Sequence, residues 1–207
     1  MRIAVFGASG RIGRLVVDKA LGHGHEVTAF VHAKTVGIAD DHLRIERGDV
    51  RDLDAVRAAV SGNSAVAFAI SQREGGVHIH ERGIANVIYA MAEDFAPKLA
   101  VVSAAGAFAR TDSRLSLAHR VLVATTMRGV YDDLEAMERR VMASDLSWTI
   151  VRPYGLSDDP PTGHYRVTLD GSLLRHAKRI PRGDVASLLV KALETDTYRR
   201  RTVVVAT

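Results

Sequence analysis

The sequence predicts an α/β protein whose doubly wound, mostly parallel sheet is covered by helices on both faces, with a small C-terminal extension. Three observations predict this fold class. Short apolar runs alternate with segments of helical periodicity. The apolar runs are almost uninterrupted, which is typical of parallel strands buried on both faces. A glycine-rich turn joins the first strand to the first helix. The length of 207 residues suits one domain, and we expect residues 1–207 to form a single unit.

The first half of the chain alternates strand and helix. We expect strands at 2–6, 26–31, 43–46, 65–70 and 98–103. We expect helices at 12–21, 52–60 and 78–93. Gly22 is a stop signal after the first helix. Asp52 is suited to cap the second helix, because its carboxylate accepts amide hydrogens that have no intrahelical partner.

The second half has longer connections, beginning with small residues at 104–117. We expect helices at 130–143 and 180–194, and strands at 147–152, 165–169 and 202–206. The loop at 153–163 is rich in proline and aspartate. Asp170-Gly171 predicts a hairpin-like turn. Pro181 is expected at the start of the last helix, with Asp184 in its first turn.

The amino-acid composition excludes several classes of function. The hydrophobic fraction of 47% is typical of a protein with a real core. There is no cysteine, which excludes disulfides, thiolate metal sites and a cysteine nucleophile. No apolar run approaches the ~20 residues that span a bilayer, so we expect a cytoplasmic protein with no membrane partner. The net charge of +4 favours an anionic small molecule over nucleic acid, because no basic run is interleaved with aromatic residues.

The turn from Gly7 to Gly13 reads Gly-Ala-Ser-Gly-Arg-Ile-Gly and has the context of a phosphate cradle, since it follows a strand and opens a helix. One glycine permits the tight turn, a second lets the backbone approach a pyrophosphate, and a third allows close packing of helix on strand. The helix N-terminus adds unpaired amides and a partial positive charge. The spacing is Gly-x-x-Gly-x-x-Gly rather than the Gly-x-Gly-x-x-Gly of dehydrogenases. The sequence therefore predicts a Rossmann-type domain that binds a nicotinamide dinucleotide. The expected loop contacts are Gly7, Ser9, Gly10, Arg11, Ile12 and Gly13.

The end of the second strand bears on which dinucleotide is bound. NAD-dependent proteins place an acidic residue there to hold the ribose hydroxyls. This chain has His32-Ala33-Lys34 instead, and no acid before Asp40. His32 and Lys34 could attract a 2′-phosphate, or they could form a polar turn. We expect NADP, in its reduced form NADPH, as the cofactor.

Asp49 follows the third strand and admits two interpretations. It could accept a hydrogen bond from the adenine amino group, or it could be a turn or capping residue.

Residues for several other chemistries are missing. In many short-chain dehydrogenases a tyrosine acts with a lysine four residues later, and none of the tyrosines 89, 131, 154, 165 and 198 has that lysine. The pairs His23-Gly24-His25 and His78-Ile79-His80 lack helical i, i+4 partners and an acidic cluster, so we expect surface histidines and no metal site. Ser103 lies at the end of the fifth strand without a Gly-x-Ser-x-Gly elbow, which argues against a hydrolase.

Several segments resemble those of one known group. They are Gly-Asp-Val at 48–50, Gly-Ile-Ala-Asn-Val at 83–87, the run Asp-Asp-Pro-Pro-Thr-Gly-His-Tyr-Arg-Val-Thr-Leu-Asp-Gly at 158–171, and Ile-Pro-Arg-Gly-Asp-Val at 180–185. With these segments the chain resembles, over nearly its whole length, the atypical short-chain dehydrogenases of the NmrA-like group. Within that group it is most similar to the NADPH-dependent flavin reductases, also called biliverdin reductase B.

The resemblance implies hydride transfer from NADPH to a flat conjugated acceptor that stacks on the nicotinamide. It implies cofactor contacts from Val50, Ala69, Ile70, Ser71, Ser103, Pro153 and Gly155. It implies substrate contacts from Arg73 and Tyr154, with Ser103 and Tyr154 as the catalytic candidates and the C-terminal extension on the substrate side. There are departures, all at the cofactor or substrate. His32 replaces a family arginine, Ser103-Ala104 replaces Thr-Ser, and Arg152-Pro153-Tyr154 replaces Pro-Pro-His.

Two functions remain open at this level. The first is an NADPH-dependent oxidoreductase that reduces a flavin, quinone or linear tetrapyrrole, an anionic small molecule able to spread the incoming charge over its own ring system. The second is a non-catalytic NADP(H) sensor that acts through a protein partner. Epimerase-like chemistry is disfavoured by the missing Tyr–Lys pair. Either a monomer or a homodimer is compatible with the sequence.

Overall fold

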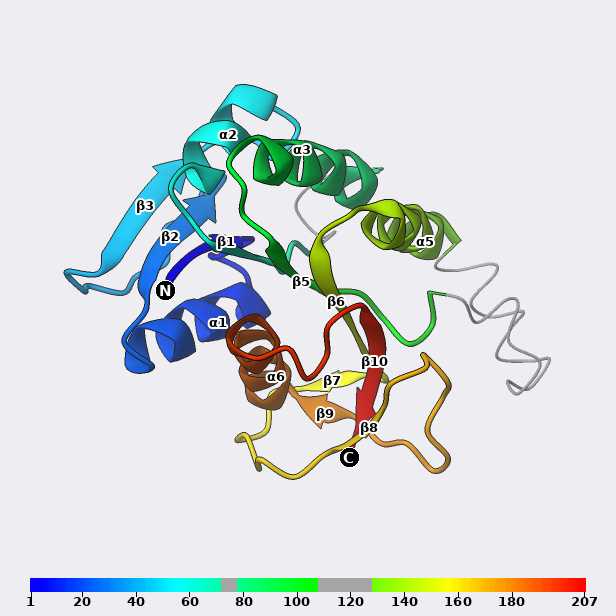
Figure 1. Ribbon diagram of the computed structural model, residues 1–207. Coiled ribbons are helices and arrows are strands. Elements are labelled where there is room, and N and C mark those ends of the chain that lie inside the picture. Colours follow the sequence, from blue (N-terminus) through cyan, green and yellow to red (C-terminus); the bar gives the residue numbers. More distant parts are fainter. Residues whose placement is uncertain (72–77, 108–127) are drawn as a thin grey trace.

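The computed structural model describes residues 1–71, 78–107 and 128–207, and its centre is an eight-stranded sheet (Figure 1). The strands are β1 (Arg2–Phe6), β2 (Glu26–Val31), β3 (Leu43–Arg47), β4 (Ala65–Phe68), β5 (Lys98–Val102), β6 (Ser147–Pro153), β8 (Arg166–Thr168) and β10 (Arg201–Ala206). Their order is β3-β2-β1-β4-β5-β6-β10-β8, and every neighbouring pair is parallel except β10 with β8. The order changes direction between β1 and β4, which is where doubly wound sheets bind ligands.

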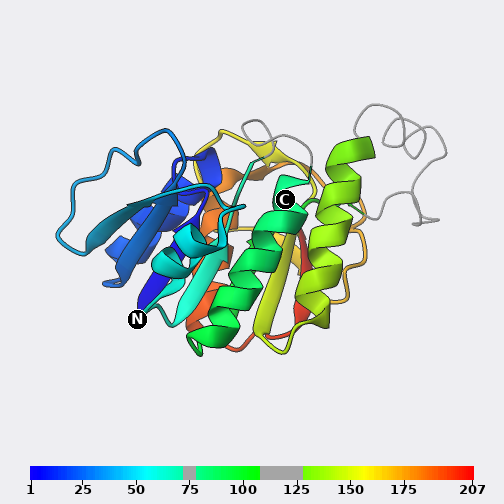
Figure 2. The ribbon, with the colours of Figure 1, turned by 90° about the horizontal axis from the view of Figure 1, so that it is seen from above.

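Helices cover both faces of this sheet, as Figures 1 and 2 show. They are α1 (Arg11–Gly22), α2 (Leu53–Val60), α3 (Ile79–Glu93), α5 (Arg128–Ala143) and α6 (Arg182–Glu194). Helices α1 and α6 pack together on one face, and α2, α3 and α5 lie on the other. The predicted fold class is therefore confirmed. None of the helices within the described ranges is long and apolar enough to cross a membrane.

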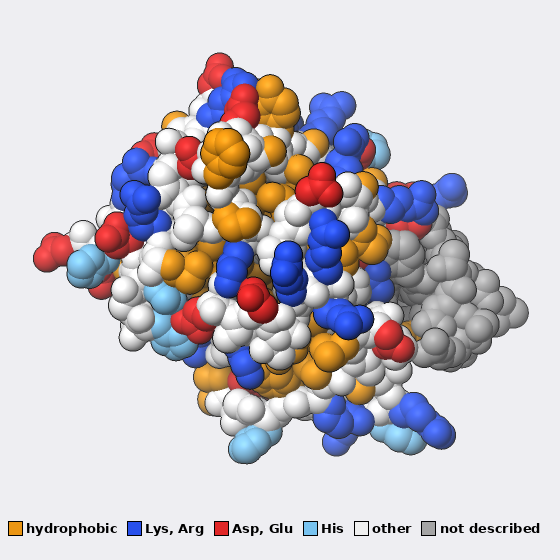
Figure 3. All heavy atoms as spheres, viewed as in Figure 1, with side chains coloured by type: hydrophobic (Ala, Val, Ile, Leu, Met, Phe, Trp, Pro, Cys, Tyr) orange, Lys and Arg blue, Asp and Glu red, His pale blue; other side chains and the backbone are white. Residues whose placement is uncertain are grey.

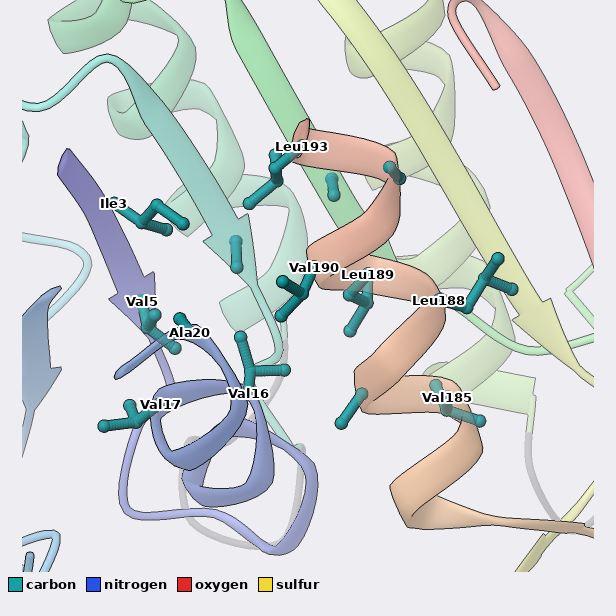
Figure 4. Packing of buried hydrophobic residues seen from close by; sticks show 14 of the residues in the cluster. Ile3, Val5, Val16, Val17, Ala20, Val185, Leu188, Leu189, Val190 and Leu193 are labelled. Carbon is teal, nitrogen blue, oxygen red and sulfur yellow. The ribbon is translucent and has the colours of Figure 1, made fainter. Parts of the chain in front are cut away.

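Each central strand sends alternate side chains into two separate apolar cores. In β1, Ile3 and Val5 face α1 and α6, whereas Ala4 and Phe6 face the opposite helices. Figure 4 shows the first core, where side chains from α1 and α6 pack beside Ile3 and Val5. Burial on both faces is the physical reason for the uninterrupted apolar runs in the sequence.

Three expectations about the C-terminal third are wrong. The loop at 153–163 contains β7 (Leu156–Ser157), which pairs with β9 (Ile180–Pro181) in a small second sheet. Ile180 and Pro181 are therefore strand, and α6 begins at Arg182. The turn at 170–171 does not join a hairpin, because β8 pairs with β10. Such short strands pair with residues far away in sequence, so they leave no local pattern.

Candidate functional site

A cavity of about 390 Å³ opens at the carboxyl edge of the sheet, beside the change in strand order. The turn after β1, the segments after β2, β3 and β4, and the start of α3 surround it. Its lining residues are Gly7, Ser9, Gly10, Arg11, Phe30, Val31, His32, Lys34, Gly48, Asp49, Val50, Arg51, Ile70, Ser71 and Ile79. Ten of the residues expected at the cofactor thus surround one cavity.

The glycine loop forms one wall, and its three glycines differ in role. Gly7 has φ +77°, and a Cβ there would lie 2.6 Å from the carbonyl oxygen of Ala69. A Cβ on Gly13 would lie 2.1 Å from the oxygen of Gly7. Gly10 has an ordinary extended backbone, and a Cβ there would lie 3.1 Å from its nearest neighbour. The fold itself therefore requires glycine at positions 7 and 13. At Gly10, the lack of a side chain mainly leaves space in the cavity for a ligand.

Gly10 is also the N-cap of α1, and it has no side chain with which to cap the helix. The first amides of α1 therefore have neither an intrahelical acceptor nor a side-chain acceptor from the cap. In α2, by contrast, the Asp52 carboxylate accepts hydrogen bonds from Asp54 and Ala55, as predicted. The start of α1 is thus suited to receive an anion from the cavity.

Basic side chains line the cavity where β2 and β3 end. His32 and Lys34 follow β2, and Arg51 follows β3. Asp49 alone is acidic among the described residues that line the cavity. Arg51 was not among the expected site residues, although two residues after Asp49 is a favourable position for an arginine to pair with it.

Arg51 neutralises Asp49. Its Nε lies 2.9 and 3.1 Å from the two carboxylate oxygens, and its Nη2 lies 2.5 Å from Oδ2. These bonds, opposed by partial burial, lower the pKa of Asp49 to about 2. The Arg51 amide also donates to Oδ1 at 2.9 Å, so Asp49 has the turn role that was one of its two interpretations. The adenine contact stays a prediction.

Ser103 lies at the end of β5, outside the cavity lining, and its hydroxyl donates to Glu138 at 2.5 Å. Glu138, on α5, is fully buried and also accepts from Arg152 Nε at 2.9 and 3.1 Å. A buried carboxylate is tolerated only with such partners. This Ser103–Glu138–Arg152 network fixes the serine hydroxyl. No local pattern signals it, because a glutamate on an amphipathic helix resembles a solvated residue.

His80 connects the cavity wall to α5. Its Nδ1 lies 2.8 Å from Asp133 Oδ2, and its Nε2 lies 3.1 Å from the carbonyl oxygen of Ile70, which lines the cavity. Both contacts fix the orientation of the imidazole ring between α5 and the end of β4. Burial opposes ionisation of Asp133, but the hydrogen bonds from the ring and from the His80 and Glu81 amides still hold its pKa below the usual value.

The expectation of surface histidines is therefore wrong at His80, whose exposed fraction is 3%. His23 and His25 have one acidic partner that the sequence did not associate with them. Both rings hydrogen-bond to Glu194 at the end of α6. Residues 171 and 169 positions apart cannot be paired by local spacing.

The remaining expected site residues lie outside the cavity lining. Ile12 and Gly13 lie within α1, Ala69 is buried after β4, and Pro153 ends β6. Tyr154 is 40% exposed, and its amide donates to the carbonyl oxygen of Val205. The Gly155 carbonyl oxygen accepts from the Ile180 amide. Arg73 lies outside the described residues.

An ion pair joins the glycine loop to the loop after β7. Arg11 Nη1 lies 3.3 Å from Asp158 Oδ2, and Arg182 Nη1 lies 2.5 Å from Asp158 Oδ1. Asp184, which is almost fully buried, accepts from the amides of Thr162 and Gly163 at 3.0 and 2.9 Å. The segment at 158–163 is thus anchored to the first turn of α6 beside the glycine loop.

Comparison with known proteins adds three findings. The profile of a family described as NAD(P)H-binding matches residues 7–196. An uncharacterized Mycobacterium bovis protein is 40% identical over 93 residues, which are 45% of this chain but 11% of that protein, so the chain spans about a tenth of the length of that relative. An oxidoreductase of Pestalotiopsis microspora is 25% identical over 92% of this chain and 79% of that protein.

Two solved structures share the fold. A short-chain dehydrogenase/reductase from Veillonella parvula, in complex with NADP, has a TM-score of 0.84 and 17% identity, over 100% of this chain and 94% of that chain. A Streptococcus pneumoniae protein proposed to be an NADH-flavin reductase has a TM-score of 0.79 and 20% identity, over 100% and 99% of the two chains.

Proposed function

Because this chain belongs to the NAD(P)H-binding family, we propose that it is an oxidoreductase that uses NADPH to reduce a flat conjugated acceptor, such as a flavin, a quinone or a linear tetrapyrrole. One observation carries the proposal. At the carboxyl edge of the sheet, one cavity combines a glycine loop and an uncapped helix start with the basic residues that follow β2 and β3.

The residues present fit a dinucleotide. A Cβ on Gly10 would project where the pyrophosphate approaches, and the start of α1 offers amide donors there. Arg11 and Lys34 supply positive charge, His32 adds a side chain able to hydrogen-bond, and the carboxylate of Asp49 is paired with Arg51. A cavity end of this kind favours a 2′-phosphate over a free hydroxyl, because charge-assisted hydrogen bonds are the stronger ones.

The bound cofactor supplies the hydride. The chain's own contribution is to bind, to orient and to hold the polar groups at the strand ends in place. Glu138 and Arg152 hold the Ser103 hydroxyl at the end of β5, and His80 holds the carbonyl of Ile70 at the end of β4. The sequence has no Tyr–Lys pair to pass a proton. An acceptor that delocalises charge and takes its proton from water avoids that requirement.

Two likenesses support a flavin-like acceptor. The segment at 158–171 resembles that of the flavin reductases also called biliverdin reductase B, and one structural neighbour is proposed to be an NADH-flavin reductase. The net charge of +4 suits an acceptor that carries phosphate or carboxylate groups.

The test is NADPH oxidation by purified protein, followed by absorbance, against a panel of flavins, quinones and biliverdins. We expect turnover with at least one acceptor and none in Gly10→Val. A matched control is His42→Ala, which removes an exposed histidine before β3, outside the cavity lining, and should leave the rate unchanged. Tight NADPH binding without oxidation across the panel would contradict the enzyme proposal and favour an NADP(H) sensor that acts through a protein partner.

A further inference from the structure

Three side chains able to bind a metal meet at the edge of the sheet opposite the cavity. His23 and His25 flank Gly24 in the connection from α1 to β2, and Glu194 is the last residue of α6. His23 Nδ1 lies 2.7 Å, and His25 Nε2 lies 2.8 Å, from the same oxygen, Glu194 Oε1. All three ligand atoms lie within 4.8 Å of one another.

The fold holds these side chains in place before any ligand binds. Gly24 has φ +77°, a conformation in which the chain reverses and both flanking rings reach the same carboxylate. The ring centroids lie 6.2 Å apart. Figure 4 shows apolar side chains of α1 and α6 packed against one another. The helix before the two histidines and the helix that ends at Glu194 are thus joined by one close-packed core.

We propose that His23, His25 and Glu194 bind one divalent transition-metal ion of the zinc, nickel or copper class. Two imidazole nitrogens and one carboxylate oxygen are a donor set that such ions prefer. In the present arrangement, protons occupy the space between the donors. Metal–ligand bonds of ~2.0–2.1 Å in a tetrahedral site place ligand atoms about 3.3 Å apart. The two short contacts therefore need to lengthen by about half an ångström, and the two ring nitrogens, which now lie within 4.8 Å of each other, need to reach the same ~3.3 Å separation.

Exposure at the cluster suits an ion that enters from solvent. The side chain of His23 is 53% exposed, whereas those of His25 and Glu194 are 13% and 27% exposed. Two ligands are thus held by the protein, and the third lies on the open side, where water can complete the coordination. Figure 3 shows histidine side chains on the part of the surface where Figure 1 marks the N-terminus.

Binding requires a defined change of protons. A neutral imidazole binds through one nitrogen and keeps its proton on the other. The proton of His25 then lies on Nδ1, which is 3.3 Å from the amino nitrogen of Met1, and that contact has to rearrange. The ion replaces two hydrogen bonds by three coordinate bonds. It therefore ties the end of α6 to the connection before β2.

The test uses protein without a histidine tag, stripped with a chelator and titrated with zinc chloride by calorimetry and thermal unfolding. We expect one ion per chain, and a rise in Tm of about 5–10 °C at a hundredfold excess over Kd. Glu194→Gln preserves the shape of the side chain, and His23→Ala changes a half-exposed residue, so both variants should fold. Each should weaken zinc affinity by about tenfold or more.

His164→Ala is the matched control, because it removes an exposed histidine in another loop. It should bind zinc as the parent does. Absence of stoichiometric zinc binding by the parent would overturn the proposal. Equal zinc affinity in Glu194→Gln, His23→Ala and His164→Ala would overturn it as well. Because the readouts are zinc binding and Tm, the result is independent of the proposed reductase activity.

Discussion

At the scale of single residues, a side chain added to the glycine loop would meet different atoms at Gly7, Gly10 and Gly13. An added Cβ at Gly7 or Gly13 would strike backbone atoms of the protein, at 2.6 and 2.1 Å. At Gly10 the nearest atom is 3.1 Å away, and the backbone is ordinary. A substitution at Gly10 should therefore affect mainly dinucleotide binding, whereas one at Gly13 should affect mainly the stability of the fold.

Gly10→Val should abolish dinucleotide binding and lower the free energy of unfolding by only about 1 kcal/mol, the scale of a less favourable N-cap. Gly13→Ala should lower it by about 1–3 kcal/mol, because the turn has to move to admit the methyl group. Nicotinamide fluorescence and urea denaturation measure the two effects. Unchanged NADPH affinity in Gly10→Val would show that the loop is not the pyrophosphate site.

His32 and Lys34 should give a preference for NADPH over NADH of about tenfold or more, because a charge-assisted hydrogen bond contributes ~1.5–3 kcal/mol. The double variant His32→Ala, Lys34→Ala should lose most of that preference while keeping its affinity for NADH. Fluorescence titration with both cofactors decides the matter. Equal dissociation constants in the parent protein would refute this assignment.

At the scale of elements, α5 caps α3. The residue before α3, His78, makes no side-chain cap, and has φ 63°. Asp133 of α5 instead accepts from the His80 amide at 3.0 Å, the Glu81 amide at 2.9 Å and the His80 ring. Arg140 of α5 adds an ion pair to Glu81. One carboxylate thus caps a helix and fixes the wall of the cavity.

Asp133→Asn should lower the free energy of unfolding at pH 7 by about 1–3 kcal/mol, because it removes a buried carboxylate that accepts hydrogen bonds from the His80 ring and from the His80 and Glu81 amides. The pKa of Asp133 is below the usual value, so its contribution is complete above about pH 4 and is lost as pH falls through the folded-state pKa. The difference between parent and variant should therefore shrink below about pH 4 in urea denaturation.

Asp132→Asn is the control for this experiment. Asp132 is partly exposed and lies 3.7 Å from Arg128, a contact typical of a weak surface pair. Its replacement should change stability by less than about 1 kcal/mol. A pH-independent difference between the parent and Asp133→Asn would refute the role of the ionised Asp133 carboxylate as the acceptor.

At the scale of the whole molecule, the sheet separates two apolar cores. Leu189 of α6 is fully buried in one, and Met137 of α5 is fully buried in the other. Because the sheet lies between the two cores, a change in the packing of one core can affect the packing of the other only through the strands.

Leu189→Ala and Met137→Ala should each lower the free energy of unfolding by about 2–5 kcal/mol. The effects of the double variant should add to within about 0.5 kcal/mol, since the two sites share no neighbours across the sheet. Urea denaturation of the four proteins gives the coupling energy directly. A coupling above about 1 kcal/mol would show that the strands transmit repacking between the cores.

The sequence alone determined the parts of this protein that depend on local pattern. The apolar runs predicted the central parallel strands, because a strand buried on both faces has no polar side to show. The glycine spacing between strand and helix predicted the turn beside the cavity. The lack of an acid directly after the second strand pointed to His32 and Lys34 as cofactor contacts, and both line the cavity.

Only the tertiary structure decided which charged side chains are buried and with whom. Three helix residues occupy positions that resemble solvated ones, yet each is hydrogen-bonded to a residue outside its own helix: Glu138, Asp133 and Glu194. The short strands β7 and β9 likewise pair across a long stretch of chain, with Leu156 opposite Ile180. Local sequence carries hydrophobic periodicity and turn chemistry. It does not carry the pairing of polar groups that meet only after the helices dock on the sheet, because that pairing depends on distances set by packing.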